Sequence, residues 1–325
     1  MMLVVPKEAR GARLDRFLFS ALAALPRAPS RAEIQRWIDN DRVQINGRSV
    51  KSGARLSEGQ QVSVEPESAP LSAAVPELGV VFDVLYVDAD LVVLVKPAGL
   101  VVHPAKGHET GTLVHGLLGR GLFDVENFAS ADGAEPNEVT DRVRPGIVHR
   151  LDKGTSGVMV VARTLFAQRV LKEQFAAHTI ERAYECICLG DLAPQSFETL
   201  HGRNPQDRMK FTSRVRSGKR AVTHVLPLER FAVATHAECR LETGRTHQIR
   251  MHLSEHGHSI LGDPLYGKPP KSPVLRALAD RLGHQALHAR TLGLDHPQTG
   301  KRMRWEASPP ADFQVVLQSL RMLPS

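Results

Sequence analysis

One short segment of this chain places an acid between a basic pair and a turn of small residues. Asp152 follows the residues His-Arg-Leu and precedes Lys-Gly-Thr-Ser-Gly, and an apolar run comes directly afterwards. A carboxylate at the end of a strand, beside an arginine that favours its charged form, can act as a nucleophile. The alternative is an aspartate that only caps the turn, with help from Thr155 and Ser156. The sequence leaves open whether Arg150 pairs with Asp152 or points away from it.

A tyrosine and two arginines further along the chain are additional candidates for a site. Tyr184 lies in a predicted strand, where the plain alternative is a half-buried aromatic side chain that only packs. Residues 241–252 (LETGRTHQIRMH) predict a sharp glycine turn and then a helix with Thr246 as its N-cap. Arg245 at this turn could reach a phosphate, and Arg250, one turn into the helix, could reach back to a carboxylate. The alternative for both is an ordinary arginine on a helix surface.

Taken in chain order, these segments resemble the three motifs of the RluA-type pseudouridine synthases. Motif I is similar to residues 149–158, motif II to residues 181–186 and motif III to residues 241–252. Shorter matches, to which we assign no chemical role, extend the resemblance over residues 80–310; they are residues 96–97, 102–104, 262–267 and 285–289.

The resemblance implies a role for each candidate residue. It makes Asp152 the residue required to isomerise uridine to pseudouridine, with Arg250 paired to it. It places Tyr184 beside the target base, where the phenol could assist removal of the proton from C5. It gives Arg150 a contact with RNA or with the flipped base, and it makes Arg245 a supporting residue. Whether Asp152 attacks C1′, attacks C6 or removes a proton from C2′ stays open.

The resemblance also implies a substrate and partners. The expected substrate is a set of loop uridines in an interface stem-loop of 23S rRNA, presented as free RNA or in an assembling large ribosomal subunit. Isomerisation needs no redox step and no external group, so we expect neither a cofactor nor a metal. We further expect a monomer that acts in the cytoplasm.

Composition and charge are those of a soluble protein with a polyanionic partner. The 325 residues are 42% hydrophobic and 24% charged, and no apolar run approaches the roughly 18–20 residues that a membrane helix needs. The N-terminus lacks the pattern of a signal peptide, and the three cysteines are too few for a disulfide framework. A net charge of +7 favours nucleic acid or an acidic surface as partner, although an ordinary solvated surface would also explain it.

A stretch rich in proline, alanine and serine, residues 66–76, predicts a linker between two domains. Residues 1–65 predict two helices, the second with a capping box at Ser30 and Glu33, then a hairpin at Asn46-Gly47 and a strand over residues 61–64. This order resembles the small alpha-L RNA-binding fold. Eleven basic against seven acidic residues give this part a charge of +4, and a phosphate-facing patch is expected from Arg13, Arg16, Arg31 and Arg36, with Arg27 and Arg42 beside them.

Residues 77–325 predict an α+β domain with a mixed, mostly antiparallel sheet, which the resemblance implies to be the pseudouridine synthase fold. The expected strands are residues 83–88, 91–95 with a continuation at 100–104, 183–189, 221–228, 236–241 and 302–305. The expected helices are residues 110–118, 165–177, 246–256 and 311–322, and a polar surface loop is expected at 131–144.

Two rival functions can be written from the same residues. His252 and His256 have the H-x-x-E-H spacing of one group of zinc peptidases and would share a helix face, with Asp263, Asp280 or Glu306 as the third ligand. In a chain with fifteen histidines, such a five-residue pattern arises by chance. A non-catalytic RNA-binding protein would carry the same basic surface but would not need Asp152, Tyr184 and Arg250.

Overall fold

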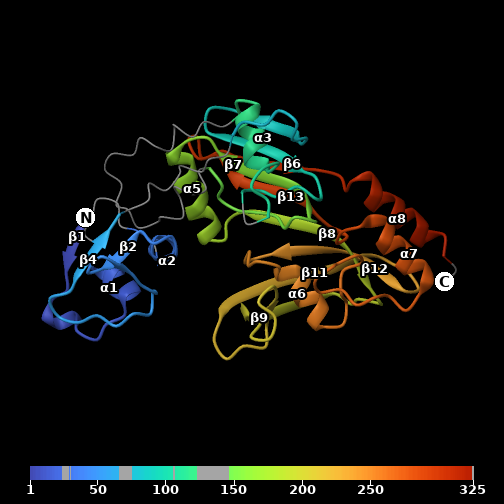
Figure 1. Cartoon of the computed structure of the whole chain (residues 1–325). Coiled ribbons are helices and arrows are strands. Elements are labelled where there is room, and N and C mark those ends of the chain that lie inside the picture. The colour runs from blue at the N-terminus through green and yellow to red at the C-terminus, as the bar shows by residue number, and fades with distance from the viewer. Residues whose placement is uncertain (24–28, 30, 66–74, 105–106, 123–145, 324–325) are drawn as a thin grey trace. The chain divides into compact units, whose positions relative to one another are not determined.

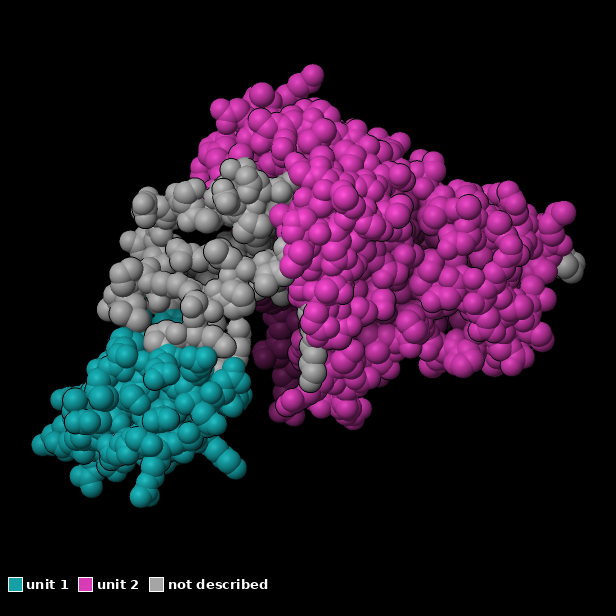
Figure 2. Space-filling model, turned by 45° about the horizontal axis from the view of Figure 1, so that its top comes forward, with its two compact units in different colours: residues 1–73, 129–145 teal, residues 74–128, 146–325 magenta. Residues whose placement is uncertain are grey.

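The computed structural model describes residues 1–23, 29, 31–65, 75–104, 107–122 and 146–323, and the chain forms two compact units (Figures 1 and 2). The first unit contains residues 1–73 and 129–145, and the second contains residues 74–128 and 146–325. The division after residue 73 falls inside the predicted linker. The predicted capping box and the polar loop at 131–144 lie outside the described residues.

The first unit packs two helices on a four-stranded antiparallel sheet with strand order β1-β4-β2-β3. Helix spacing in the sequence places Leu14, Leu18, Ile34 and Trp37 on the buried faces, against Val62 and other strand residues. Both predicted helices, the Asn46-Gly47 hairpin and the last strand are confirmed. Its elements are β1 (Met2–Val4), a 3-10 turn (Lys7–Ala9), α1 (Leu14–Ala21), α2 (Arg31–Asp39), β2 (Val43–Ile45), β3 (Arg48–Ser49) and β4 (Gln61–Val64).

The second unit is built on a ten-stranded sheet with strand order β10-β9-β11-β12-β8-β13-β7-β6-β5, and β14 pairs with β13. Among the described strands only β13 and β7 run parallel, so the predicted mixed, mostly antiparallel sheet is confirmed. Its elements are β5 (Asp83–Val87), β6 (Leu91–Lys96), α3 (Leu113–Gly119), β7 (Ser156–Ala162), α5 (Leu165–Ala176), β8 (Glu181–Leu189), β9 (Gln195–Arg203), β10 (Phe211–Thr212), β11 (Lys219–Arg230), β12 (Ala234–Leu241), α6 (Gln248–Glu255), α7 (Pro273–Leu282), β13 (Leu287–Asp295), β14 (Arg302–Glu306) and α8 (Ala311–Arg321).

Strands β6 and β7 are buried on both faces, which explains why each is a continuous apolar run in the sequence. Alternate residues point to opposite faces of the sheet. Leu94 and Met159 pack on one face with Leu113 and Leu117 of α3. Val93 and Val160 pack on the other face with Ala167 and Leu171 of α5. This sandwich fixes the start of β7, and with it the loop that carries Asp152.

Two local predictions are wrong. Residues 100–104 do not continue the strand before them, because the chain curls there so that the carbonyls of Pro97 and Leu100 can accept hydrogen bonds from the buried Lys96 ammonium. Thr246 is not the N-cap of α6; His247 takes that position in a left-handed conformation with φ of 58°. Four strands and a helix were not predicted from the sequence: β1, β9, β10, β13 and α7.

Gly157, near the start of β7, fits a place where a side chain has no room. Its φ is +122°, and a Cβ atom would lie 2.2 Å from the carbonyl oxygen of Ala289 on β13. We expect Gly157→Ala to lower the free energy of unfolding by about 2–4 kcal/mol, through overpacking and backbone strain. Denaturant unfolding of Gly300→Ala is the control, because Gly300 also has a positive φ but open space around it. Its expected cost is about 1 kcal/mol, and equal losses in the two variants would contradict the packing explanation.

Candidate active site

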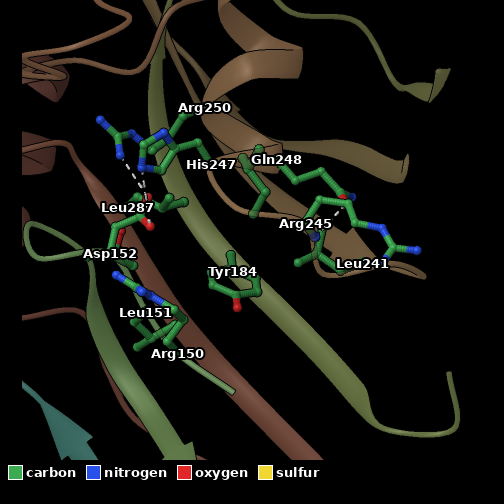
Figure 3. A pocket seen from close by; sticks show the side chains of 12 residues that line it. Arg150, Leu151, Asp152, Tyr184, Leu241, Arg245, His247, Gln248, Arg250 and Leu287 are labelled. Carbon is green, nitrogen blue, oxygen red and sulfur yellow. Dashed lines mark hydrogen bonds and ion pairs between the residues drawn. The ribbon is translucent and has the colours of Figure 1, made fainter. Parts of the chain in front are cut away.

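Asp152 and Arg250 form an ion pair across 98 residues of sequence (Figure 3). Asp152 lies in the loop just before β7, and Arg250 lies in the first turn of α6. The Nη1 group of Arg250 donates to Oδ2 of Asp152 at 2.7 Å, which is the pairing that the motif resemblance implies. Oδ1 of Asp152 accepts no hydrogen bond from any described residue, and Nε2 of His247 lies 3.8 Å from it. One carboxylate oxygen is therefore held by Arg250, and the other has no hydrogen-bond donor among the described residues.

A second carboxylate holds Arg250 from behind. Asp263 accepts hydrogen bonds from Nε and Nη2 of Arg250 at 2.7 and 2.8 Å, in the bidentate geometry that pairs a guanidinium with a carboxylate. Burial by itself would raise the pKa of Asp263, but the hydrogen bonds and charge of Arg250 hold that pKa below its usual value. Backbone N–H groups of Leu265 and Tyr266 also donate to Asp263. The three charges sum to −1, and that charge faces the cleft at Asp152.

His247 faces Asp152 from its strained position before α6. The backbone N–H of Phe211 donates to the Tyr266 oxygen at 2.7 Å, and the Tyr266 hydroxyl lies 3.1 Å from Nδ1 of His247. The Tyr266 proton is thus free to be donated to Nδ1, which leaves the imidazole proton on Nε2, the nitrogen nearer Asp152. Burial lowers the pKa of His247, so the ring is neutral near pH 7. Sequence reasoning gave His247 no role, although it belongs to the segment that resembles motif III.

The loop that carries Asp152 is fastened from below by buried polar side chains. Lys96 Nζ donates to the carbonyls of Pro97, Leu100 and Lys153 at 2.8, 2.9 and 3.2 Å. Gln285 donates to the hydroxyl of Thr155, and a Cβ atom on Gly154 would collide with Gln285. Lys96, Asp263 and Gln285 all lie in the short matches that received no chemical role. The order of these matches along the chain, which follows the family, is the sequence signal that points to them.

His149 serves the same loop rather than the chemistry. Its Nε2 accepts the backbone N–H of Val160 at 3.1 Å, and its ring stacks on Phe175 with centroids 4.8 Å apart. Burial lowers the pKa of His149 to about 3, so the ring stays neutral and keeps its acceptor. The histidine of the His-Arg-Leu-Asp run thereby ties the segment before Asp152 to β7.

Tyr184 lies on β8 at the centre of the cleft, beside an apolar wall that includes Leu241 and Leu287 (Figure 3). Its side chain is half-buried, and burial raises the pKa of its phenol. The phenol is therefore neutral near pH 7 and can donate a hydrogen bond. A flat apolar wall beside a carboxylate suits a planar ring such as a base.

The two arginines predicted beside the site both line the cleft. Arg150 is exposed, lines the same cleft as Asp152, and makes no ion pair with it or with any other described acid. Arg245 donates from Nε to the carbonyl of Arg220 at 3.2 Å, which directs its side chain towards β11. Neither is neutralised by a carboxylate of the described chain.

The N-terminal arginines are less uniform than the sequence suggests. Arg13 pairs with Asp15 at 2.8 Å, and the Arg31 guanidinium lies 4.9 Å from the ring centre of Phe19. Arg16 lies in α1, and the side chain of Arg36 is outside the described residues. A phosphate-binding role for this set stays a prediction.

An exposed basic segment of the second unit was not predicted. Residues 203–220 contain seven lysines and arginines against one acid. Arg203, Arg208, Arg214 and Arg216 are among its exposed members. The segment is anchored to α6, because Glu255 accepts hydrogen bonds from Thr212 and Ser213. We call residues 203–220 the basic hairpin.

The zinc-peptidase pattern on α6 is used in another way. Both ring nitrogens of His252 lie 2.9 Å from threonine hydroxyls, those of Thr199 and Thr223. His256 bonds through Nδ1 to the carbonyl of His252. A third ligand does not join them among the described side chains, where the one group with metal-like spacing is Asp88, Asp90 and His296.

Comparison with known proteins identifies the class of this fold and site. A family model described as RNA pseudouridylate synthase matches residues 90–255, and an S4 domain model matches residues 12–62. Ribosomal large subunit pseudouridine synthase D of Neisseria meningitidis serogroup A is 41% identical over 98% of this chain and 82% of its own length. The protein of the same name from Pseudomonas aeruginosa is 39% identical over 98% of this chain and 94% of its own.

A solved structure agrees with the fold. Human RNA pseudouridylate synthase domain containing 4 has a TM-score of 0.54 and 27% identity, and the match covers 75% of this chain and 95% of that one. The chain therefore belongs to the RNA pseudouridylate synthase family, with an S4 domain at its N-terminus. Both predicted resemblances are confirmed. No helix in the described part of the chain has the length and apolar character to cross a membrane.

Removing Asp263 tests whether it holds Arg250 in place. We expect Asp263→Asn to lower the free energy of unfolding by roughly 3–5 kcal/mol at pH 7, because a buried cation loses a charged partner. Since the pKa of Asp263 is depressed in the folded protein, its stabilisation is complete above the ordinary aspartate pKa of about 4 and is lost as the pH falls below it. Urea unfolding at pH 7 and pH 3 should show the difference between wild type and variant shrinking. A difference that grows at low pH would contradict this.

Proposed function

We propose that this protein isomerises uridines of 23S rRNA to pseudouridine, with Asp152 as the catalytic carboxylate. The observation that carries the proposal is the free oxygen of Asp152, which faces a cleft while its other oxygen is held by Arg250. The names of the relatives at 39–41% identity support RNA of the large ribosomal subunit as the substrate. The interface stem-loop is the finer substrate that we propose.

The reaction breaks the bond between N1 and C1′, rotates the uracil and joins C5 to C1′, and the proton on C5 leaves. Attack on C1′, attack on C6 and removal of a proton from C2′ all begin with an ionised carboxylate at the substrate. Arg250, held from behind by Asp263, fixes Oδ2 of Asp152 with one hydrogen bond and does not bind its outer oxygen. The choice among the three steps stays open.

Tyr184 is proposed to pack against the uracil ring. Its raised phenol pKa makes it a hydrogen-bond donor at neutral pH, so it is poorly suited to take the proton from C5 as a free phenolate. An ionised carboxylate is the stronger candidate for that proton in this cleft. The tyrosine then acts by holding the plane of the base while it turns.

A uridine must leave its stack to enter the cleft, which costs a few kcal/mol and costs least in a loop. Phosphate contacts offset this cost. We propose that Arg150 and Arg245 at the cleft, the basic hairpin, and Arg13, Arg16, Arg31 and Arg36 of the S4 domain supply them. The proposed division of labour is RNA binding by residues 1–65 and catalysis by residues 77–325, in a cytoplasmic monomer that acts on 23S rRNA or an assembling subunit.

The test is release of tritium from 23S rRNA labelled at C5 of uridine. We expect Asp152→Asn to lower the rate by more than about 10³-fold, as loss of a nucleophile does in other enzymes, while RNA binding is retained. Asp280→Asn is the matched control, because Asp280 is exposed on α7 and its change should leave the rate intact.

Each other outcome has a definite meaning. Release by both wild type and Asp152→Asn would keep the reaction and remove Asp152 from its centre. Binding of 23S rRNA without release by the wild type would favour a different RNA substrate, or the rival function of a non-catalytic RNA-binding protein.

A further inference from the structure

A buried arginine beside the cleft has no acidic partner. Arg182 lies on β8 two residues before Tyr184, so both side chains point to the same face of the sheet. The residue is 8% exposed. Its Nη2 donates to the carbonyl of Glu242 at 2.9 Å, and its Cζ lies 5.5 Å from the ring centre of Phe175. Within the described chain, no carboxylate forms an ion pair with it, and its buried Nε has no hydrogen-bond partner.

Such a cation is costly in a folded protein. Buried charges are ordinarily paired, and a guanidinium without a counterion retains a large part of its desolvation penalty. Arg250 shows the usual solution in this same unit, since it is equally buried but bonds two carboxylates. Near Arg182 the neighbouring charge is Arg245, of the same sign, and burial together with Arg245 lowers the pKa of Arg182. An anion is the missing partner.

The chain leaves room for that partner at the edge of the cleft. The turn after β12 passes over the guanidinium, and a Cβ atom on Gly244 would lie 2.3 Å from Nη1 of Arg182. Gly244 is exposed and its φ is not in the left-handed region, and the absence of a Cβ atom there lets the guanidinium keep its position close to the turn. Leu241 at the end of β12 and Arg245 in this turn line the cleft. Nη1 makes no hydrogen bond with a described residue, so it is available to a ligand.

We propose that Arg182 binds a phosphate of the substrate RNA, one that flanks the nucleotide held at Tyr184. A uridine in an RNA chain brings an anion on each side of its ribose, and guanidinium groups are suited to phosphate oxygens. Arg182 thus fixes the backbone next to the base that Asp152 acts on. The inference rests on the proposed function, because it requires that the cleft receives a nucleotide of RNA.

Binding of a 23S rRNA fragment at several salt concentrations tests this role, in an Asp152→Asn background that stops turnover. We expect Arg182→Met to weaken binding about 10–100-fold and to reduce the slope of log affinity against log salt by about 0.7–0.9, the value for one lost phosphate contact. Arg182→Lys keeps the charge and should keep the slope. Arg304→Met is the control, because Arg304 is exposed and already paired with Glu181 and Glu306, so its loss should change neither quantity.

Thermal unfolding separates this role from a structural one. If the cation lacks a partner in the free protein, Arg182→Met keeps or raises Tm, whereas a structural arginine would lower Tm and leave the salt slope intact. If Arg182→Met does not fold, the comparison of Arg182→Lys with Arg182→Gln gives the same reading, with slope kept in the first and reduced in the second. In the otherwise wild-type protein, KM for the RNA should rise more than kcat falls.

The two proposals fail in different ways. An unchanged salt slope in Arg182→Met or Arg182→Gln would overturn the phosphate contact while tritium release by the wild type still supports the reaction. Absence of tritium release with a reduced slope in these variants would overturn the reaction and leave the phosphate contact standing.

Discussion

The arginine between two carboxylates is the interaction on which the rest of the site depends. Arg250 is buried, so its charge must be compensated. Asp263 does this by accepting two parallel hydrogen bonds from Arg250, and backbone N–H groups of Leu265 and Tyr266 hold Asp263 in turn. Asp152 then needs only one bond to Arg250, and its second oxygen stays free. If Asp152 were the sole counterion, the same cation would draw on both of its oxygens. The buried Asp263 thus leaves one oxygen of Asp152 without a hydrogen-bond donor among the described residues.

Three parts of the chain must meet for this arrangement to form, and each is held by ordinary packing. The start of β7 is fixed because β6 and β7 are buried between α3 and α5. Helix α6 is fixed by Gln248, whose side chain accepts from the Arg245 N–H and donates to β11. The segment with Asp263 joins through Tyr266, which also reaches His247. Packing of the core therefore fixes the positions of a few polar side chains at its edge.

Two buried arginines, Arg250 in the cleft and Arg182 beside it, show opposite solutions to one physical problem. Arg250 is compensated within the protein and so belongs to a permanent scaffold. Arg182 has no acid of the described chain beside it, and we infer that its compensation comes with the RNA. Together with Arg150, Arg245 and the basic hairpin, this places positive charge around the cleft, while the group of Asp152, Arg250 and Asp263 brings a net charge of −1 to it. A polyanion with an electrophilic sugar or base fits that distribution.

The sequence by itself determined the local elements and the residues of the three motifs. Helix and strand periods are short-range, so α1, α5, α8 and the strands β8 and β12 beside the site were predictable, and the order of the motifs along the chain identified the family. Only the tertiary structure decided that Asp263 anchors Arg250, that His247 adopts a left-handed conformation facing Asp152, and that Arg182 is buried without an acid. These features depend on tertiary contacts, between residues 13 positions apart for Arg250 and Asp263 and 60 apart for Arg182 and Glu242, and nothing in local spacing records them. The same limit explains why β13, the central strand that pairs with both β7 and β8, was missed.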